Sequence, residues 1–237
     1  MFEWLVESPT DRVPRLLKRH YLKEILDWIL SKGLSLHKDG TGVDTLKGSW
    51  ELLHAVLRHC GNGQWAGFAS GLNQCIVKNV SGFSSMVIEG SGSVNRSESI
   101  AVLKSISQVL ELLAEQQIKH QYTIHLEHAS KIMESSLHLI HKNFQSASDE
   151  EQACICFLVR ESCKIFESHL DRFTNHKKLW EAVMHEQFGM LLVTAFHDQE
   201  RSLLDSETRV RSRHILEGVL YHPECVAGEL HCYVSAC

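Results

Sequence analysis

The residues best suited to metal chemistry gather near the C-terminal end of the chain. His222, Cys225, His231 and Cys232 fall within one short stretch. Zinc takes four nitrogen or sulfur ligands at short spacings. Here a His-x2-Cys pair is followed by an adjacent His-Cys pair, which is not the spacing of a standard zinc knuckle. We therefore interpret them as scattered side chains of a tail over 223–237, keep the four as candidate metal ligands, and predict no metal or other cofactor.

Other histidines also form pairs that could bind a metal ion. His125 with His128, and His138 with His141, are each three positions apart, which places both members of a pair on one side of a helix. Both pairs lie beside the apolar stripe of the expected helix, so a solvated or rim position explains them. No serine or cysteine lies in the setting of a nucleophile elbow or a protease. We predict that the chain is not an enzyme and has no small-molecule substrate.

Basic residues offer a candidate binding face. Arg12, Arg15, Arg19 and Lys23 share one side of the first expected helix, where they could contact RNA phosphates or an acidic partner. A solvated outer face is the alternative, and it is the more common explanation of such a cluster. Three arginines near the C-terminal end form a second, smaller cluster: Arg209, Arg211 and Arg213.

The remaining polar patterns favour ordinary surface. Glu111 with Glu115, and Glu161 with Glu167, have helix-surface spacing, and a solvated face explains both pairs. The glycines at 90 and 92 lack the rest of a dinucleotide fingerprint or a P-loop, and no strand precedes them. A flexible loop is the expected structure there.

Composition limits the class of protein. With 43% hydrophobic and 22% charged residues, the chain resembles an average soluble globular protein. The net charge of −5 argues against a surface that binds nucleic acid all over. The N-terminus does not resemble a signal peptide, and no apolar run approaches the ~20 residues of a membrane span. We therefore expect reduced cysteines, an intracellular location and no association with membranes.

Helices must position all of these side chains. The only prolines are Pro9, Pro14 and Pro223, so no proline interrupts a helix between 15 and 222. Apolar residues recur at three- and four-residue spacing, and Ser148 with Glu151 forms a capping box. The pattern predicts helices over 12–32, 44–60, 64–80, from about 97, and over 120–145, 149–173, 177–199 and 206–221. Five large side chains are expected in the core: Trp28, Trp50, Phe166, Leu170 and Trp180.

The helix spacing predicts an all-α fold built from antiparallel helix pairs. Taken two at a time, the expected helix starts are 52, 56 and 57 residues apart. An irregular α-solenoid fits these steps best, and a globular helical bundle is the alternative. We divide the chain into N-terminal helices (1–80), a Gly/Ser-rich loop (81–96), a main helical stack (97–222) and the Cys/His-bearing tail (223–237).

Two segments in the last third of the chain carry a resemblance. Residues 173–180, Phe-Thr-Asn-His-Lys-Lys-Leu-Trp, lead into an apolar helix, and residues 214–224, His-Ile-Leu-Glu-Gly-Val-Leu-Tyr-His-Pro-Glu, end one. This region resembles the large nucleolar helical-repeat proteins of the unhealthy-ribosome-biogenesis family. The resemblance covers about 50 of the 237 residues. It implies an internal or truncated segment of a longer solenoid, with no catalytic residues and a scaffold role in large-subunit pre-ribosomal RNA processing.

These observations lead to two functional hypotheses. The first is a non-enzymatic helical scaffold in the nucleus and nucleolus, with ribosome assembly factors as partners and an indirect association with pre-ribosomal RNA. The alternative is a helical-repeat protein–protein adaptor in another intracellular pathway, located in the cytoplasm.

Overall fold

The computed structural model describes residues 22–34, 43–59, 69–89, 96–119, 122–143, 147–170, 189–191, 193–196 and 204–220. Among these residues every regular element is a helix and none is a strand. The all-α class predicted from the sequence is therefore confirmed.

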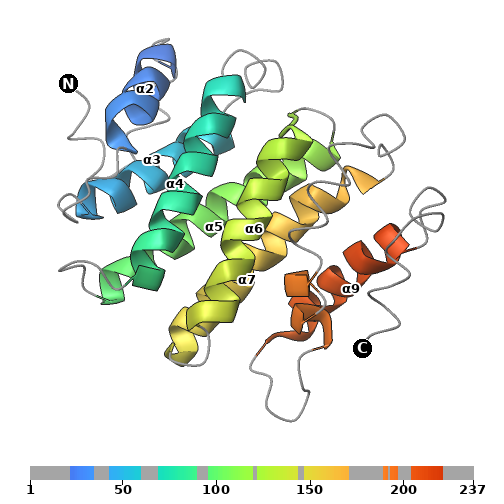
Figure 1. Cartoon of the computed structure of the whole chain (residues 1–237). Coiled ribbons are helices and arrows are strands. Elements are labelled where there is room, and N and C mark those ends of the chain that lie inside the picture. Colours follow the sequence, from blue (N-terminus) through green and yellow to red (C-terminus); the bar gives the residue numbers. More distant parts are fainter. Residues whose placement is uncertain are drawn as a thin grey trace.

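The helices form a stack with α2 and α9 at opposite ends (Figure 1). Short helical stretches also occur at 189–191 and 193–196. The bounds of the elements are α2 (Leu22–Trp28), continued by a π-helical turn η2 (Ile29–Gly33), α3 (Val43–His59), α4 (Ala69–Glu89), α5 (Arg96–Ile118), α6 (Leu126–Asn143), α7 (Asp149–Glu167) and α9 (Ser206–Leu220).

The start of α7 shows how local sequence sets a helix boundary. Ser148 has an extended backbone, and its hydroxyl accepts a hydrogen bond from the Glu151 N–H at 3.4 Å. In return, the Glu151 carboxylate accepts one from the Ser148 N–H at 3.0 Å. Asp149 and Glu150 add negative charge at the positive end of the helix dipole. The capping box predicted at Ser148–Glu151 is confirmed.

The helices alternate between two layers. α3, α5, α7 and α9 form one layer, while α4 and α6 form the other. The largest contacts of α5, α6 and α9 are each with a helix two places away along the chain, and α6 also packs across the interface on α7. A two-layer stack that grows in one direction is the architecture of an α-solenoid, in which each repeat contacts its neighbours.

Hydrogen bonds fix the direction of the helices. Gln117, near the end of α5, accepts one from the Ile124 N–H just before α6, at 2.9 Å, so the chain reverses there. Asn73, near the start of α4, donates to the Thr123 carbonyl oxygen at 3.1 Å, which places the starts of α4 and α6 side by side. Helices within a layer are therefore parallel, and successive helices are antiparallel.

Three hydrogen bonds between successive members of a layer have a similar spacing along the chain. A side-chain donor and its backbone acceptor are 50 residues apart in Asn73–Thr123, 48 in Gln117–Ile165 and 52 in Thr208–Cys156. One structural repeat therefore spans about 50 residues. The steps of 52 to 57 residues expected from the sequence are close to this value.

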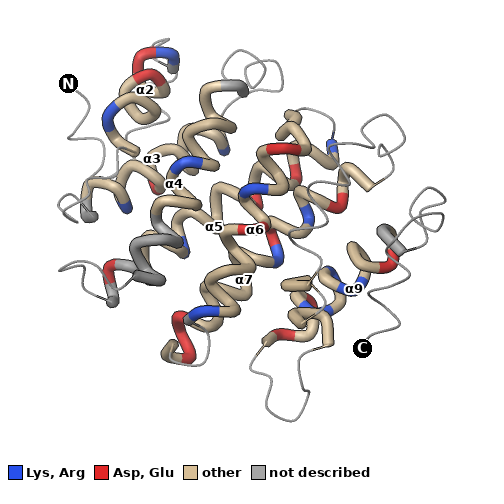
Figure 2. The backbone as a smooth tube through the Cα atoms, viewed as in Figure 1, with Lys and Arg blue, Asp and Glu red and all other residues tan. Residues whose placement is uncertain are grey.

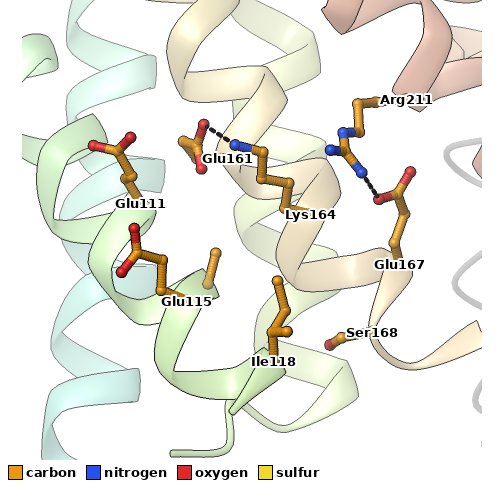
Figure 3. Close-up of a pocket in the computed structure, with 9 residues that line it drawn as sticks. Glu111, Glu115, Ile118, Glu161, Lys164, Glu167, Ser168 and Arg211 are labelled. Atoms are coloured by element: carbon orange, nitrogen blue, oxygen red, sulfur yellow. Dashed lines mark hydrogen bonds and ion pairs between the residues drawn. The ribbon is translucent and has the colours of Figure 1, made fainter.

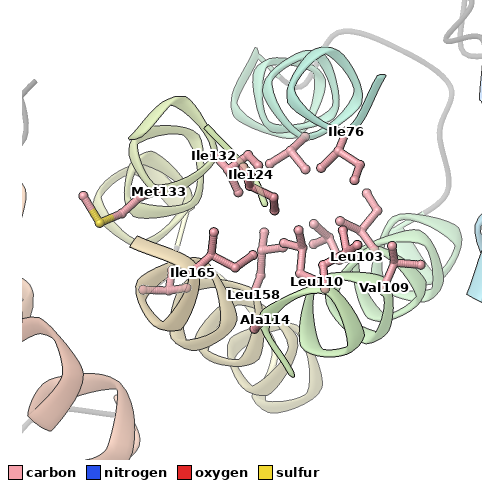
Figure 4. Close-up of a cluster of buried hydrophobic side chains, with 14 of the residues drawn as sticks. Ile76, Leu103, Val109, Leu110, Ala114, Ile124, Ile132, Met133, Leu158 and Ile165 are labelled. Carbon is pink, nitrogen blue, oxygen red and sulfur yellow. The ribbon is translucent and has the colours of Figure 1, made fainter. Parts of the chain in front are cut away.

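The apolar core fills the space between the layers (Figure 4). Ile76 of α4 and Ile132 of α6 lie across from Leu110 of α5 and Leu158 of α7, and all four are buried. Burial of apolar side chains is the main force that holds such a stack together.

The large side chains expected in the core divide into three groups. Trp50 and Phe166 are fully buried, as predicted. Trp28 and Leu170 are only half-buried and pack against the edge of the core. Trp180 lies outside the described residues.

One predicted boundary is wrong between the N-terminal helices and the main stack. α4 continues to Glu89, so the loop predicted over 81–96 is a helix over 81–89, and the division at residue 80 falls inside α4. Gly82 and the neighbouring serines lower helix propensity by about 1 kcal/mol or less each, but they leave the backbone donors in place, unlike proline. Residues 90–95 lie outside the described part of the chain.

Two other helices are shorter than predicted. α6 begins at Leu126 instead of 120, because the Ile124 N–H bonds to the Gln117 side chain in place of a helical carbonyl. α7 ends at Glu167, six residues before the predicted 173, and Ser168 donates a side-chain hydrogen bond back to the Ile165 carbonyl oxygen at 2.7 Å. Such local side-chain bonds compete with helix continuation. α3 and α9 match their predicted ranges to within one residue at each end.

Candidate functional site

A charged groove crosses the layer formed by α5, α7 and α9 (Figure 3). Its volume is about 330 Å³, at the small end of the range for ligand sites. Because α5, α7 and α9 are successive members of one layer, the solenoid places residues from three distant segments on one surface. The lining residues, which define the α5–α7–α9 groove, are Glu111, Ala114, Glu115, Ile118, Glu161, Lys164, Glu167, Ser168 and Arg211.

The most unusual residue of the groove is Glu161 of α7. Its side chain is 1% exposed, and its Oε1 accepts from Arg160 Nε at 3.1 Å and from Lys164 Nζ at 2.8 Å. Its Oε2 is buried without a hydrogen-bond partner among the described residues. A buried carboxylate is costly unless its oxygens are paired. Glu161 is therefore only half satisfied by the chain itself.

The α9 wall of the groove is held by an ion-pair network. Glu167 pairs through Oε2 with Arg211 at 2.7 Å and through Oε1 with His214 Nδ1 at 3.1 Å. Glu207 lies 3.3 Å from Arg160 and 3.9 Å from Lys164. The cationic side chains of α7 and α9 at this site are thus already paired with carboxylates from the chain.

The α5 wall is different, because its acidic residues are exposed and largely free. No described residue forms an ion pair or hydrogen bond with Glu111, and Glu115 has only a long contact of 3.8 Å with the exposed Lys119. Figure 3 shows Glu111 and Glu115 on α5 across from Lys164 and Glu167 on α7. The charge that the groove offers to a ligand is therefore negative.

A second cavity of about 340 Å³ lies at the other end of the same layer. It involves α3, the first turns of α5 and the start of α7. Acidic and basic residues are balanced there, and Lys47 pairs with Glu51 at 3.7 Å. Its lining residues are Lys47, Glu51, Ile100, Ala101, Lys104, Ser105, Gln108 and Glu150. Figure 2 shows that charges of both signs are spread over the helices of the stack.

The cysteines of α7 lie in the packed interior. Cys154, Cys156 and Cys163 are buried free thiols, so these three agree with the reduced cysteines expected from the sequence. Burial raises the pKa of Cys156 to about 11, and it also raises the pKa of Cys163. A thiol that stays protonated at neutral pH is a poor nucleophile, so these side chains act as packing groups.

Most of the predicted site residues fall outside the described part of the chain. This applies to three members of the first basic face, Arg12, Arg15 and Arg19, whereas Lys23 is exposed on α2. It also applies to the four candidate metal ligands in the tail: His222, Cys225, His231 and Cys232. Within the described residues, no group of three or more His, Cys, Asp or Glu side chains is placed to hold a metal ion.

Two of the three arginines in the second basic cluster are bound within the chain, whereas the half-buried Arg209 has a nitrogen, Nη1, without a hydrogen-bond partner among the described residues. Arg211 is paired with Glu167. Arg213 stacks over the Phe196 ring at 5.1 Å and donates to the Ala195 carbonyl oxygen at 3.0 Å. These two arginines therefore attach α9 to its neighbours instead of presenting positive charge to a partner.

Of the two glutamate pairs that were expected to be solvated, only one is exposed in the structure. Glu111 and Glu115 are exposed, as predicted. Glu161 and Glu167 are not, because α7 is covered by helices on several sides and their side chains are 1% and 10% exposed. The sequence did contain an indication that Glu161 is buried, since it lies among apolar residues with Arg160 and Lys164 on either side.

Among the described helices, none is both long and apolar enough to cross a bilayer. Comparison of the chain with models of protein families, with curated proteins and with solved structures found no match.

Proposed function

We propose that this protein is a non-enzymatic helical-repeat scaffold that binds partner proteins on the surface of the α3–α5–α7–α9 layer. The observation that supports it is the α5–α7–α9 groove, where three repeats contribute to one charged concavity and where Glu111 lacks a partner in the described residues. Solenoids bind partners over extended surfaces that several repeats share.

The charge of the groove favours protein over nucleic acid as the direct partner. Binding to a phosphate backbone relies on lysine and arginine side chains that neutralise phosphates. In this groove Lys164 is paired with Glu161, and Arg211 is paired with Glu167. An association with pre-ribosomal RNA would then run through another protein or through the basic face at Arg12, Arg15, Arg19 and Lys23.

The more specific form of the proposal is a scaffold for large-subunit ribosome assembly in the nucleolus. Its support is the resemblance at 173–180 and 214–224. Of these segments the structure describes 214–220, where a Cβ on Gly218 would lie 3.2 Å from the Leu170 side chain. Close packing of α9 against the end of α7 therefore explains why residue 218 is a glycine. The alternative, an adaptor in another intracellular pathway, would use the same groove.

Affinity purification of the tagged full chain from its own cells, with and without ribonuclease, tests the proposal. The wild-type chain is compared with E111Q/E115Q, which removes two charges from the groove, and with E24Q/D27N, which removes two exposed charges from α2. Large-subunit assembly factors that are lost only from E111Q/E115Q would support the nucleolar form. Other partners lost in the same way would support the adaptor. An identical set of proteins from all three chains would refute binding at this groove.

A further inference from the structure

We propose that the α5–α7–α9 groove binds an arginine side chain from a basic segment of a partner protein. This inference rests on the proposed scaffold function and names the chemistry by which the scaffold recognises its partner.

Charge complementarity identifies the occupant as a cation. Four carboxylates line the groove, against one lysine and one arginine. Both cations are paired within the chain, Lys164 with Glu161 at 2.8 Å and Arg211 with Glu167 at 2.7 Å. An anionic ligand would meet no free positive group there. A cationic ligand would meet Glu111, which has no partner among the described residues, and Glu115, whose contact with Lys119 is long and exposed.

The buried oxygen of Glu161 supplies an independent observation. Glu161 lines the groove and is fully buried, yet its Oε2 has no hydrogen-bond partner in the described part of the chain. An unsatisfied buried acceptor of this kind costs free energy, and a donor from a ligand would recover it once the Glu161 side chain turns toward the groove. It also lies on α7, across the groove from the acidic side chains of α5 (Figure 3).

Arginine fits this arrangement better than lysine. A guanidinium carries five N–H donors in a planar fork, so one side chain can bond to Glu161 and to a carboxylate of α5 at once. Its aliphatic stem can lie against apolar surface while the charged end is bound. Ala114 and Ile118 line the groove beside the glutamates, and Ile118 is 61% exposed. Lysine offers a single point charge without the fork.

The test uses fluorescein-labelled peptides and the purified full chain. Three nonapeptides have the same Gly/Ser background and carry arginines, lysines or glutamates at the same positions, and a single-stranded RNA of similar length is the fourth probe. Dissociation constants are measured by fluorescence anisotropy at two salt concentrations. The chains are the wild type, E111Q/E115Q and the matched control E24Q/D27N, whose melting temperatures verify that each is folded.

We expect the arginine peptide to bind more tightly than the lysine peptide and the glutamate peptide not to bind. Removal of both exposed carboxylates in E111Q/E115Q should weaken the binding of the arginine peptide by roughly tenfold, and E24Q/D27N should leave its dissociation constant unchanged. Equal weakening by both double variants, an equal affinity for arginine and lysine peptides, or binding of the RNA in competition with the arginine peptide would overturn the assignment. These results would leave the scaffold proposal standing, because that proposal fails only if the purifications show no groove-dependent protein partner.

Discussion

Gln117 is the side chain whose replacement best tests the packing of the repeats. It is buried near the end of α5 and joins three helices with one amide group. Its Oε1 accepts from the Ile124 N–H at 2.9 Å, and its Nε2 donates to the Ile165 carbonyl oxygen at 3.1 Å. The same Nε2 also contacts the Ser168 hydroxyl, and it lies 3.2 Å from His169 Nε2. Q117M keeps a similar shape and removes all of these bonds.

The largest cost of Q117M comes from the Ile124 N–H. Ile124 is fully buried, so its N–H would lose its acceptor without gaining water, at a cost of about 1–3 kcal/mol. The Ile165 carbonyl oxygen keeps the hydrogen bond from Ser168 at 2.7 Å, and the methionine adds apolar contact that offsets part of the loss. We expect the free energy of unfolding to fall by about 2 kcal/mol.

Urea denaturation followed by circular dichroism measures this change, and the neighbouring residue provides the control. Gln116 is half-buried, and its Oε1 has no hydrogen-bond partner among the described residues. Q116M makes the same chemical change without removing such a bond, and because it also removes a buried unsatisfied acceptor, it should leave the stability unchanged or raise it. With an m-value of about 2 kcal/mol/M, Q117M should lower the urea midpoint by about 1 M. Equal midpoints for Q117M and Q116M would refute the link between α5, α6 and α7.

Three further predictions follow from described side chains. S148A removes one half of the capping box and should lower the stability of the chain by about 1 kcal/mol in urea denaturation, and an unchanged urea midpoint would contradict this role of Ser148. Burial raises the pKa of Tyr122. The unfolded chain therefore releases this proton at a pH of about 10 while the folded chain keeps it, so stability should fall as the pH rises above about 10, and less so in Y122F. Cys156 and Cys163 should resist alkylation at pH 8 in the native chain and react in urea, as read by peptide mass spectrometry; rapid native labelling would contradict their burial.

The parts of the fold that could be predicted are those that depend on residues close together in the sequence. The capping box at Ser148–Glu151 marks the start of α7 because both of its hydrogen bonds lie within four residues. The absence of internal proline and the apolar periodicity indicate the all-α class. The spacing of helix starts indicates a repeat because each repeat must bury one stripe against its neighbour.

The features that could not be predicted depend on contacts between distant segments. The start of α6 depends on the side chain of Gln117, which takes the Ile124 N–H out of the helical pattern. The burial of Glu161 depends on which neighbours cover α7, and charge spacing along one helix does not report them. The groove needs α5, α7 and α9 in register, and no pattern within a single helix gives that register. Serines and Gly82 favoured a loop after residue 80, but backbone hydrogen bonding can continue through them, so composition alone placed the end of α4 too early.

The spacing of about 50 residues between bonded partners has a consequence for the mechanics of the molecule. Contacts between neighbours alone hold the curvature of a solenoid, so a small change of tilt at each junction adds up along the stack. The α5–α7–α9 groove spans two of these junctions, with Glu111 on α5 and Arg211 on α9. Bending the stack therefore changes the distance between its walls. A ligand that fits one wall separation stabilises one curvature, and by reciprocity a force or partner that sets the curvature of the stack alters the affinity of the groove.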